Sequence, residues 1–300
     1  MGRGMTQTVR KDDGVVRDEE NFFSLHGIRL DADKLINPLA LTDANVSALR
    51  DQFVAAQPFK HLVLDGLFSP RLLECIHDEF DVVRSGDWQR YDTRNEVKMG
   101  TKASTPLGPA AQLYFDTIYS KRFVDFLSRV TGVESLITDP MLHNGGMHKI
   151  PTGGKFAVHI DFNKHPINKL DNRMVFITYL NKDWLPEYGG ALQLWNGTRD
   201  KCEVEVVPEF GRSILMYQTS KSFHGHPDPV RAPAGRTRRS VAAYYYSNGR
   251  ADEASDKDHS TIFVKPITMG RFGRIALGVK YCTPPVLVDA FRVLTRRQWS

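Results

Sequence analysis

From about residue 140 onward, the chain consists of short runs of β-branched and aromatic residues separated by Gly, Pro and Asn. The runs are FAVHIDF, RMVFITYL, GGALQLW, SILMYQ and SVAAYYYS. Short strands at this spacing are typical of antiparallel sheets that fold into a sandwich or a barrel. We therefore predict an α+β protein whose core is mainly β structure.

The region before this core has the apolar spacing of helices. We expect one helix from an N-cap at Thr42 to about Ala56, and another that opens at Ser69-Pro70. Two more are expected near 109–119 and 121–131. Between these helices, HLVLDGLF (61–68) reads as a short buried strand, and the Gly-, Ser- and Thr-rich segment 96–108 reads as a loop.

A chain of 300 residues suits one large domain or two small ones, and we find no internal repeat. We expect a disordered tail over 1–20, a helical support region of the same domain over 21–139, and the β core over 140–249. The remaining residues, 250–300, are expected to form an extension that ends on a helix.

Composition excludes several classes of protein. Hydrophobic residues make up 41% of the chain and charged residues 25%, which is ordinary for a globular protein. No apolar stretch approaches the roughly 20 residues of a membrane helix, and no block of basic residues interleaved with aromatics predicts nucleic-acid binding. The three cysteines, Cys75, Cys202 and Cys282, form no disulfide pattern and indicate a reducing compartment, the cytoplasm. The oligomeric state stays open.

The segment FAVHIDF carries the most informative pair of polar residues. Side chains alternate along a strand, so His159 and Asp161 point to the same face. The later segment SFHGHPDP offers His224 and His226 as a second imidazole. Two histidines and one carboxylate form the facial triad that holds Fe(II) and leaves coordination positions open. We therefore expect a metal site here.

A basic segment follows at the head of the last core strand. GRTRRSVAAYYYS contains Arg236, Arg238 and Arg239, of which Arg238 shares a strand face with Ser240. A guanidinium beside a hydroxyl can bind the distal carboxylate of a dicarboxylate. Alternation places Arg239 on the opposite face.

Other histidines and tryptophans are expected to have structural roles. We interpret His61, His77 and His143 as surface or packing residues rather than metal ligands. Trp184 and Trp195 are expected to be core or rim aromatics.

These motifs together resemble the Fe(II)- and 2-oxoglutarate-dependent dioxygenases, specifically the prolyl 4-hydroxylase-like branch. The segments that carry the resemblance lie in about residues 140 to 248; they are GGMHKIPTGGKFAVHIDFNKH, TYLNKDWLPEYGGALQLW and SFHGHPDPVRAPAGRTRRSVAAYYYSNGR. The resemblance implies a double-stranded β-helix, or jelly-roll, supported by N-terminal helices and a C-terminal helix.

The resemblance also implies roles for individual residues. His159, Asp161 and His224 would be the iron ligands, with His224 preferred to His226 because the family places its ligand directly before Gly. Arg238 would pair with the C5 carboxylate of 2-oxoglutarate, and Tyr179 would donate a hydrogen bond to it. The implied co-substrates are 2-oxoglutarate and O2, with ascorbate as a reductant. One departure concerns the wall of the co-substrate pocket, where relatives often have a tyrosine and this chain has Lys149, beside His148.

The implied reaction is hydroxylation of an unactivated C–H bond with release of succinate and CO2. Halogenating relatives replace the carboxylate that this chain keeps at Asp161. The substrate is expected to be a small molecule or a peptide, with prolyl and other amino-acid-derived compounds preferred by resemblance alone. The segments 163–172 and 91–108 are the expected lids. Two alternatives are a non-catalytic β-helix that serves as a binding or scaffold module, and a cupin-type metalloenzyme that does not use 2-oxoglutarate.

Overall fold

A computed structural model describes residues 21–252 and 257–264 of the chain. In these residues four α-helices accompany a 13-stranded sheet, and a separate two-stranded hairpin lies near the N-terminal end. Helices and hairpin strands are α1 (Asp43–Ala55), α2 (Pro70–Glu79), α3 (Pro109–Tyr119), α4 (Lys121–Thr131), β1 (Phe22–Leu25) and β2 (Ile28–Asp31).

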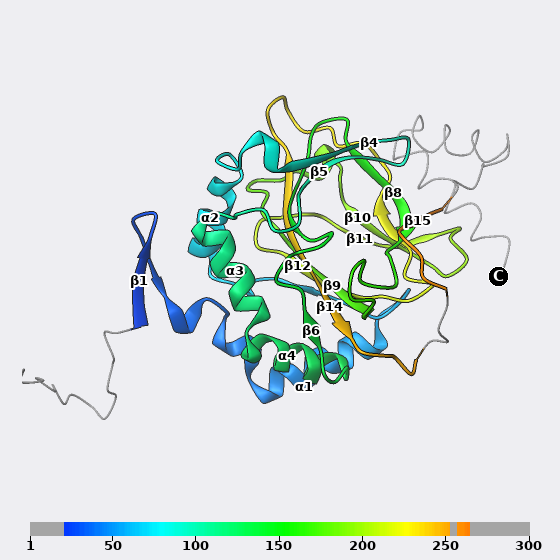
Figure 1. Ribbon diagram of the computed structural model, residues 1–300, viewed down its shortest axis with the longest axis horizontal. Helices are drawn as coiled ribbons and strands as arrows, with labels where there is room; N and C mark the ends of the chain where they lie inside the picture. The colour runs from blue at the N-terminus through cyan, green and yellow to red at the C-terminus, as the bar shows by residue number, and fades with distance from the viewer. Residues whose placement is uncertain (1–20, 253–256, 265–300) are drawn as a thin grey trace, which may run out of the picture. The chain divides into compact units, whose positions relative to one another are not determined.

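The large sheet is antiparallel at each pairing and curls into a nearly closed jelly-roll (Figure 1). Along the sheet the strands follow the order β11-β10-β13-β8-β5-β7-β14-β9-β12-β3, while β15, β4 and β6 pair with β8, β5 and β14. The bounds are β3 (His61–Leu64), β4 (Trp88–Asp92), β5 (Glu96–Thr101), β6 (Ile137–Thr138), β7 (Gly146–Ile150), β8 (Lys155–Ile160), β9 (Asp171–Tyr179), β10 (Leu192–Trp195), β11 (Cys202–Val206), β12 (Ser213–Tyr217), β13 (His224–His226), β14 (Arg238–Ser247) and β15 (Ile262–Phe263).

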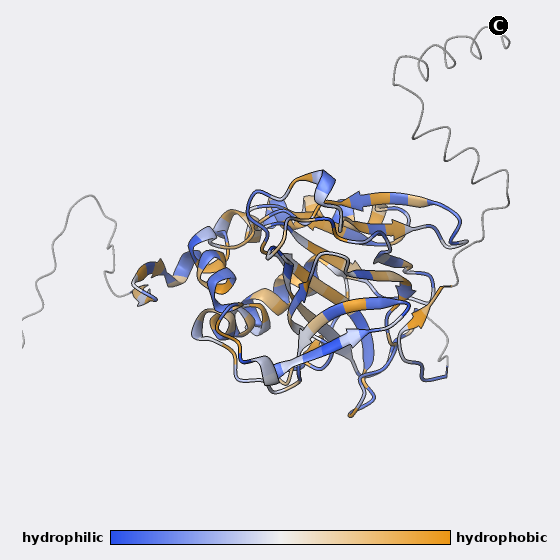
Figure 2. Ribbon diagram, turned by 90° about the horizontal axis from the view of Figure 1, so that it is seen from above, coloured by the Kyte–Doolittle hydropathy of each residue, from blue (hydrophilic) through white to orange (hydrophobic). Residues whose placement is uncertain are grey.

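The two faces of β14 separate the core from the functional cavity. Val241, Ala243 and Tyr245 pack in the main hydrophobic cluster with residues of all four helices. Alternate residues of the same strand, among them Arg238 and Ser240, line a cavity inside the jelly-roll. Figure 2 shows hydrophobic and hydrophilic segments alternating along several strands. The helices therefore pack against one face of the sheet, and the other face lines the cavity.

A buried carboxylate joins two of the supporting helices. Glu79, at the end of α2, is 3% exposed. Its two carboxylate oxygens accept hydrogen bonds from the backbone N–H groups of Ala110 (2.7 Å) and Ala111 (2.8 Å) in the first turn of α3. A negative charge at this end of a helix satisfies free donors and complements the helix dipole.

We expect Glu79→Ala to lower the free energy of unfolding by about 2–3 kcal/mol, because it removes the two hydrogen bonds from α3 and a contact with His26 Nε2 (2.8 Å), and leaves two buried backbone donors unpaired. Chemical denaturation measures this change. Glu79→Gln should lose less, since its amide keeps one acceptor. The control is Asp78→Ala, which changes an exposed residue of the same helix. Equal stability of Glu79→Ala and the wild type would contradict the assigned role.

The structure confirms all four expected helices, with boundaries within a few residues of those predicted. The loop expected over 96–108 is wrong in its first half, because Glu96–Thr101 forms β5, which pairs with β4, β7 and β8. Glu96, Lys98 and Gly100 face a cavity from this strand and alternate with Val97 and Met99, a short strand pattern that the loop assignment overlooked. The role of 91–108 as a lid stays a prediction.

Some expectations lie outside the described residues, namely the tail over 1–20 and the C-terminal helix. The proposed domain boundaries stay predictions. Among the residues that the structure describes, no helix has the length and apolar character needed to cross a bilayer.

Candidate active site

Strand pairing brings the three predicted metal ligands together. His159 lies near the end of β8, Asp161 follows that strand directly, and His224 opens β13, where it pairs with His159. The Nε2 atoms of His159 and His224 lie 3.3 and 3.5 Å from the two carboxylate oxygens of Asp161. All three side chains are buried, and their ligand atoms lie within 4.8 Å of one another. Such a group can surround one cation.

Hydrogen bonds at the other ring nitrogen set the tautomer of both histidines. The Nδ1–H of His159 donates to the carbonyl of Ala157 (2.8 Å), and the Nδ1–H of His224 donates to the carbonyl of Ser222 (2.9 Å). A carbonyl oxygen only accepts, so each neutral ring keeps its lone pair on Nε2, which faces Asp161. The buried Nε2 of His159 has no hydrogen-bond partner in the described part of the chain. This arrangement is typical of histidines that bind a metal.

The charges of this cluster also suit a divalent cation. Burial raises the pKa of Asp161, but the nearby His224, His159 and Lys98 lower it to a net value of about 2. Burial lowers the pKa of His224 to about 4, although Asp161 opposes the shift. At neutral pH the site therefore offers a carboxylate and neutral imidazole, which are the protonation states that bind Fe(II).

The predicted co-substrate residues lie in the same cavity, which has a volume of about 460 Å³. Arg238 is 4% exposed, and its Nε–H donates to the carbonyl of Gly190 (2.7 Å). The Tyr179 ring lies 4.9 Å from the Arg238 guanidinium carbon, and Ser240 pairs with Tyr179 across β14 and β9. The Tyr179 hydroxyl is buried and has no hydrogen-bond partner among the described residues. A positive charge beside a free hydroxyl can receive a carboxylate.

Arg239 faces away from the cavity, as strand alternation predicts. Its guanidinium binds the Asp81 carboxylate (2.7 Å) and the backbone carbonyl of His77 (2.8 Å), both near the end of α2. Arg236 contacts backbone carbonyls of Lys182 and Asp183 instead. Of the three arginines in this segment, Arg238 alone is among the cavity-lining residues.

Sequence reasoning missed the polar wall that β5 contributes. Lys98 lies in the cavity wall, where its Nζ is 3.2 Å from the Glu96 carboxylate and 3.6 Å from the centre of the Phe156 ring. Burial lowers the pKa of Lys98, and Glu96 partly opposes that shift. The sequence did contain a strand pattern, because Glu96 and Lys98 alternate with the apolar Val97 and Met99. The assignment of 96–108 as a loop overlooked it.

The structure also shows which of the neighbours His148 and Lys149 faces the cavity. His148 lines the cavity, whereas Lys149 turns away and its Nζ lies 4.0 Å from the Trp88 ring centre. Gly100 makes room for this histidine, because an added Cβ would come within 2.7 Å of the His148 ring. Burial, together with Lys98 and Arg238, lowers the pKa of His148 to about 3. A neutral imidazole therefore forms this part of the wall.

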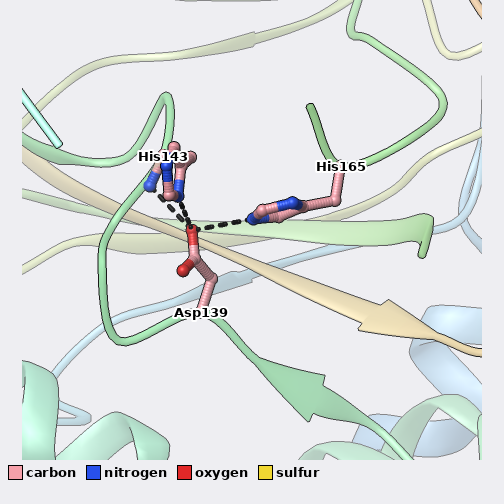
Figure 3. Close-up of side chains that lie close together, drawn as sticks. All are labelled: Asp139, His143 and His165. Carbon is pink, nitrogen blue, oxygen red and sulfur yellow. Dashed lines mark hydrogen bonds and ion pairs between the residues drawn. The ribbon is translucent and has the colours of Figure 1, made fainter. Parts of the chain in front are cut away.

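A second cluster lies beside the cavity and consists of Asp139, His143 and His165 (Figure 3). One Asp139 oxygen, Oδ2, lies 3.0 Å from His143 Nδ1 and 3.3 Å from His165 Nε2, and it also accepts from the His143 backbone N–H at 2.7 Å. The Nδ1 of His165 accepts from the backbone N–H groups of Ile167 and Asn168, each at 3.2 Å.

These contacts assign the protons differently from those of the first cluster. Because His165 Nδ1 accepts, its neutral ring carries the proton on Nε2, the atom that faces Asp139. The His143 Nδ1 lies 3.0 Å from the same carboxylate, close enough to share a hydrogen bond with it. His165 therefore directs no lone pair at Asp139, so this cluster has one fewer available imidazole than the first and is held together by hydrogen bonds. His143 also lines the cavity, and its interpretation as a surface or packing residue stays a prediction.

We expect Asp139→Asn to leave metal binding at one Fe(II) per chain, while lowering the free energy of unfolding by about 1–3 kcal/mol because buried donors lose a charged acceptor. Metal analysis of the reconstituted protein and chemical denaturation measure the two effects. Loss of a second bound metal equivalent would contradict the proton assignment.

The segment 163–172, an expected lid, contributes Pro166 to the cavity wall. His165 anchors it to Asp139 as described, and the side chain of Ile167 is 69% exposed. Its movement as a lid stays a prediction.

Comparison with known proteins shows which family and which solved structures this chain resembles. Residues 145–246 match the 2OG-Fe(II) oxygenase superfamily. No curated protein sequence matches the chain. Among solved structures, a Pseudomonas putida prolyl-4-hydroxylase is similar with a TM-score of 0.51 and 15% identity, over 68% of this chain and 100% of that one. A Trichoplax adhaerens prolyl hydroxylase in complex with a hypoxia inducible factor peptide gives a TM-score of 0.51 and 15% identity, over 70% and 92%.

At this identity the two solved structures support the fold. The family match covers the segment that contains β7 through most of β14, and hence all six residues predicted for the metal and co-substrate sites. The superfamily implies Fe(II), 2-oxoglutarate and O2, which agrees with the donor set and tautomers of the first cluster. Residues 145–246, which contain the whole candidate site, are therefore similar to the 2OG-Fe(II) oxygenase superfamily.

Proposed function

We propose that the protein is an Fe(II)- and 2-oxoglutarate-dependent hydroxylase in which His159, Asp161 and His224 hold the metal. One observation carries this assignment: two buried imidazoles, each fixed by a backbone carbonyl at Nδ1, direct Nε2 toward one buried carboxylate. The second cluster contains the same residue types, but the Nδ1 of His165 accepts a hydrogen bond, so the proton of this ring lies on the Nε2 that faces Asp139.

Iron with bound 2-oxoglutarate would supply activation of O2 and oxidation of a C–H bond, with release of succinate and CO2. The residues of this chain hold and orient the reactants. Asp161 supplies the negative charge, and the carbonyls of Ala157 and Ser222 keep both imidazoles in the binding tautomer. Burial of the cluster restricts water at the reacting centre.

Arg238, Tyr179 and Ser240 would bind the distal carboxylate of 2-oxoglutarate. The Nε–H of Arg238 is held by Gly190, which leaves the outer guanidinium nitrogens for the ligand. The unpartnered Tyr179 hydroxyl would supply a hydrogen bond. A charged donor next to a neutral donor binds the carboxylate strongly and also fixes its orientation.

Hydroxylation follows from the retained carboxylate, because Asp161 occupies the position at which halogenating relatives bind halide. For the substrate we propose a prolyl or other amino-acid-derived compound, either small or peptidyl. Similarity to two prolyl hydroxylases, one with a bound peptide, supports this class. The Glu96–Lys98 pair in the cavity wall offers both signs of charge to such a substrate.

We further propose ascorbate as a reductant and the cytoplasm as the location. The free thiols of Cys75 and Cys202 support a reducing compartment.

The two alternative functions make different predictions. A scaffold that has lost turnover needs neither a complete ligand set nor Arg238, and a cupin-type enzyme has no use for a buried arginine that binds 2-oxoglutarate. Both are less favoured here because the ligand set and Arg238 share one cavity.

Succinate formation from 2-oxoglutarate tests the proposal. Protein loaded with Fe(II) should form succinate slowly alone and faster when free proline, other amino acids or proline-containing peptides are added. Mass spectrometry of the accelerating compound should then show a gain of one oxygen atom. Absence of succinate from iron-loaded, folded protein would contradict the proposal.

A further inference from the structure

One buried imidazole of the cavity has no assigned role. His226 is 3% exposed and lines the same cavity as Arg238 and the metal cluster. Neither of its ring nitrogens has a hydrogen-bond partner among the described residues. Buried polar atoms without partners are rare in folded proteins, and two on one ring indicate a partner that arrives with a ligand.

The pairing of β13 with β10 places His226 near the arginine end of the cavity. Gly225 pairs with Gln193 and His224 pairs with Leu194, so the same antiparallel register brings His226 level with Leu192. Two residues before Leu192 is Gly190, whose carbonyl accepts the hydrogen bond from Arg238. His226 and Arg238 therefore approach the cavity at neighbouring positions.

The pairing of β13 with β8 places His226 near the metal cluster on its other side. His226 pairs with Phe156, and their ring centres lie 6.4 Å apart. The Phe156 ring in turn lies 3.9 Å from the His159 ring. His226 thus lies between the cluster that would hold iron and the arginine that would hold the distal carboxylate.

We propose that His226 is a further ligand of 2-oxoglutarate and donates a ring N–H to the carboxylate that Arg238 binds. A molecule that extends from the metal cluster to Arg238 occupies the same cavity that His226 lines. A neutral imidazole can add a hydrogen bond to a carboxylate without adding a second positive charge to a closed cavity. The inference rests on the proposed function of the site.

Anaerobic titration tests it through binding rather than turnover. His226→Phe keeps a ring but removes both nitrogens. With Fe(II) bound, the dissociation constant for 2-oxoglutarate should rise about tenfold or more, as read from the visible charge-transfer band, because a hydrogen bond to a charged group is lost. His226→Asn and His226→Gln each keep an N–H donor, and one of them should restore much of the affinity.

The control ligand is 2-oxobutyrate, which chelates iron as 2-oxoglutarate does but lacks the distal carboxylate. Its dissociation constant should not change in His226→Phe. His61→Phe, which alters a buried histidine that does not line this cavity, should change neither value. His226→Leu replaces His226→Phe if the larger ring prevents folding.

Three results would overturn the inference: unchanged affinity for 2-oxoglutarate, equal loss for both 2-oxo acids, or loss of iron, which would make His226 a metal ligand. These differ from failure of the proposed function itself. In that case the wild-type protein would give no charge-transfer band, whatever residue stands at position 226.

Discussion

Asp161→Ala is expected to lower the affinity for Fe(II) at least about 100-fold and to abolish turnover of 2-oxoglutarate. The change removes the only carboxylate among the three clustered side chains, and with it the negative charge between the two imidazoles. Metal analysis after equilibrium dialysis measures the loss.

The matched control for this change is Asp139→Ala, which removes a buried carboxylate from the neighbouring cluster of one aspartate and two histidines. This variant should retain iron when folded, because His165 carries its proton on the nitrogen that faces Asp139 and offers no lone pair to a metal there. Normal iron binding by Asp161→Ala, or loss of iron only in Asp139→Ala, would contradict the assignment of the two clusters.

Arg238→Met is expected to raise the dissociation constant for 2-oxoglutarate about 100-fold while iron binding stays unchanged. A charge-assisted, bidentate contact with a carboxylate is among the stronger hydrogen-bonded interactions, and methionine preserves much of the side-chain bulk. Anaerobic titration with 2-oxoglutarate, monitored by the charge-transfer band, gives the value.

Arg239→Met is the matched control, because Arg239 is the next residue of the same strand and its side chain binds Asp81 outside the cavity. It should leave 2-oxoglutarate binding unchanged. Loss of iron in Arg238→Met, or equal weakening in both variants, would contradict the role of Arg238.

The sequence predicts that His159, Asp161 and His224 come together, because strand alternation and the family motif agree, and the structure places them together. His159 and Asp161 share a face from spacing alone, and the segment SFHGHPDP narrows the second imidazole to two candidates. Spacing could not decide between His224 and His226, since both lie on one short strand; the resemblance preferred His224. The structure places His224 in the cluster and His226 next to it.

The cavity wall was harder to predict. β5 faces a polar cavity, so Glu96 and Lys98 occupy positions at which a strand buried in a core would have apolar side chains. The alternation of Glu96 and Lys98 with the apolar Val97 and Met99 is short, and the Gly, Ser, Thr and Pro residues that follow led to the assignment of a loop. The His148 ring fits against Gly100, which lies on a strand far away in the sequence. Local sequence patterns could not predict this contact between β7 and β5.

The second cluster shows that residue types alone do not identify a metal site. Asp139, His143 and His165 have the composition of a metal site and come from two loops that the sequence does not relate. Only the hydrogen bonds to His165 Nδ1 reveal where its proton lies. Residue identity suggests a donor set, but the partner of the second ring nitrogen determines whether a histidine can bind a metal.

The most direct test is an anaerobic titration of the purified protein with Fe(II), followed by 2-oxoglutarate. A visible charge-transfer band that saturates at one equivalent of iron and one of 2-oxoglutarate per chain is predicted. Absence of the band from folded protein that has bound iron would contradict the proposed function.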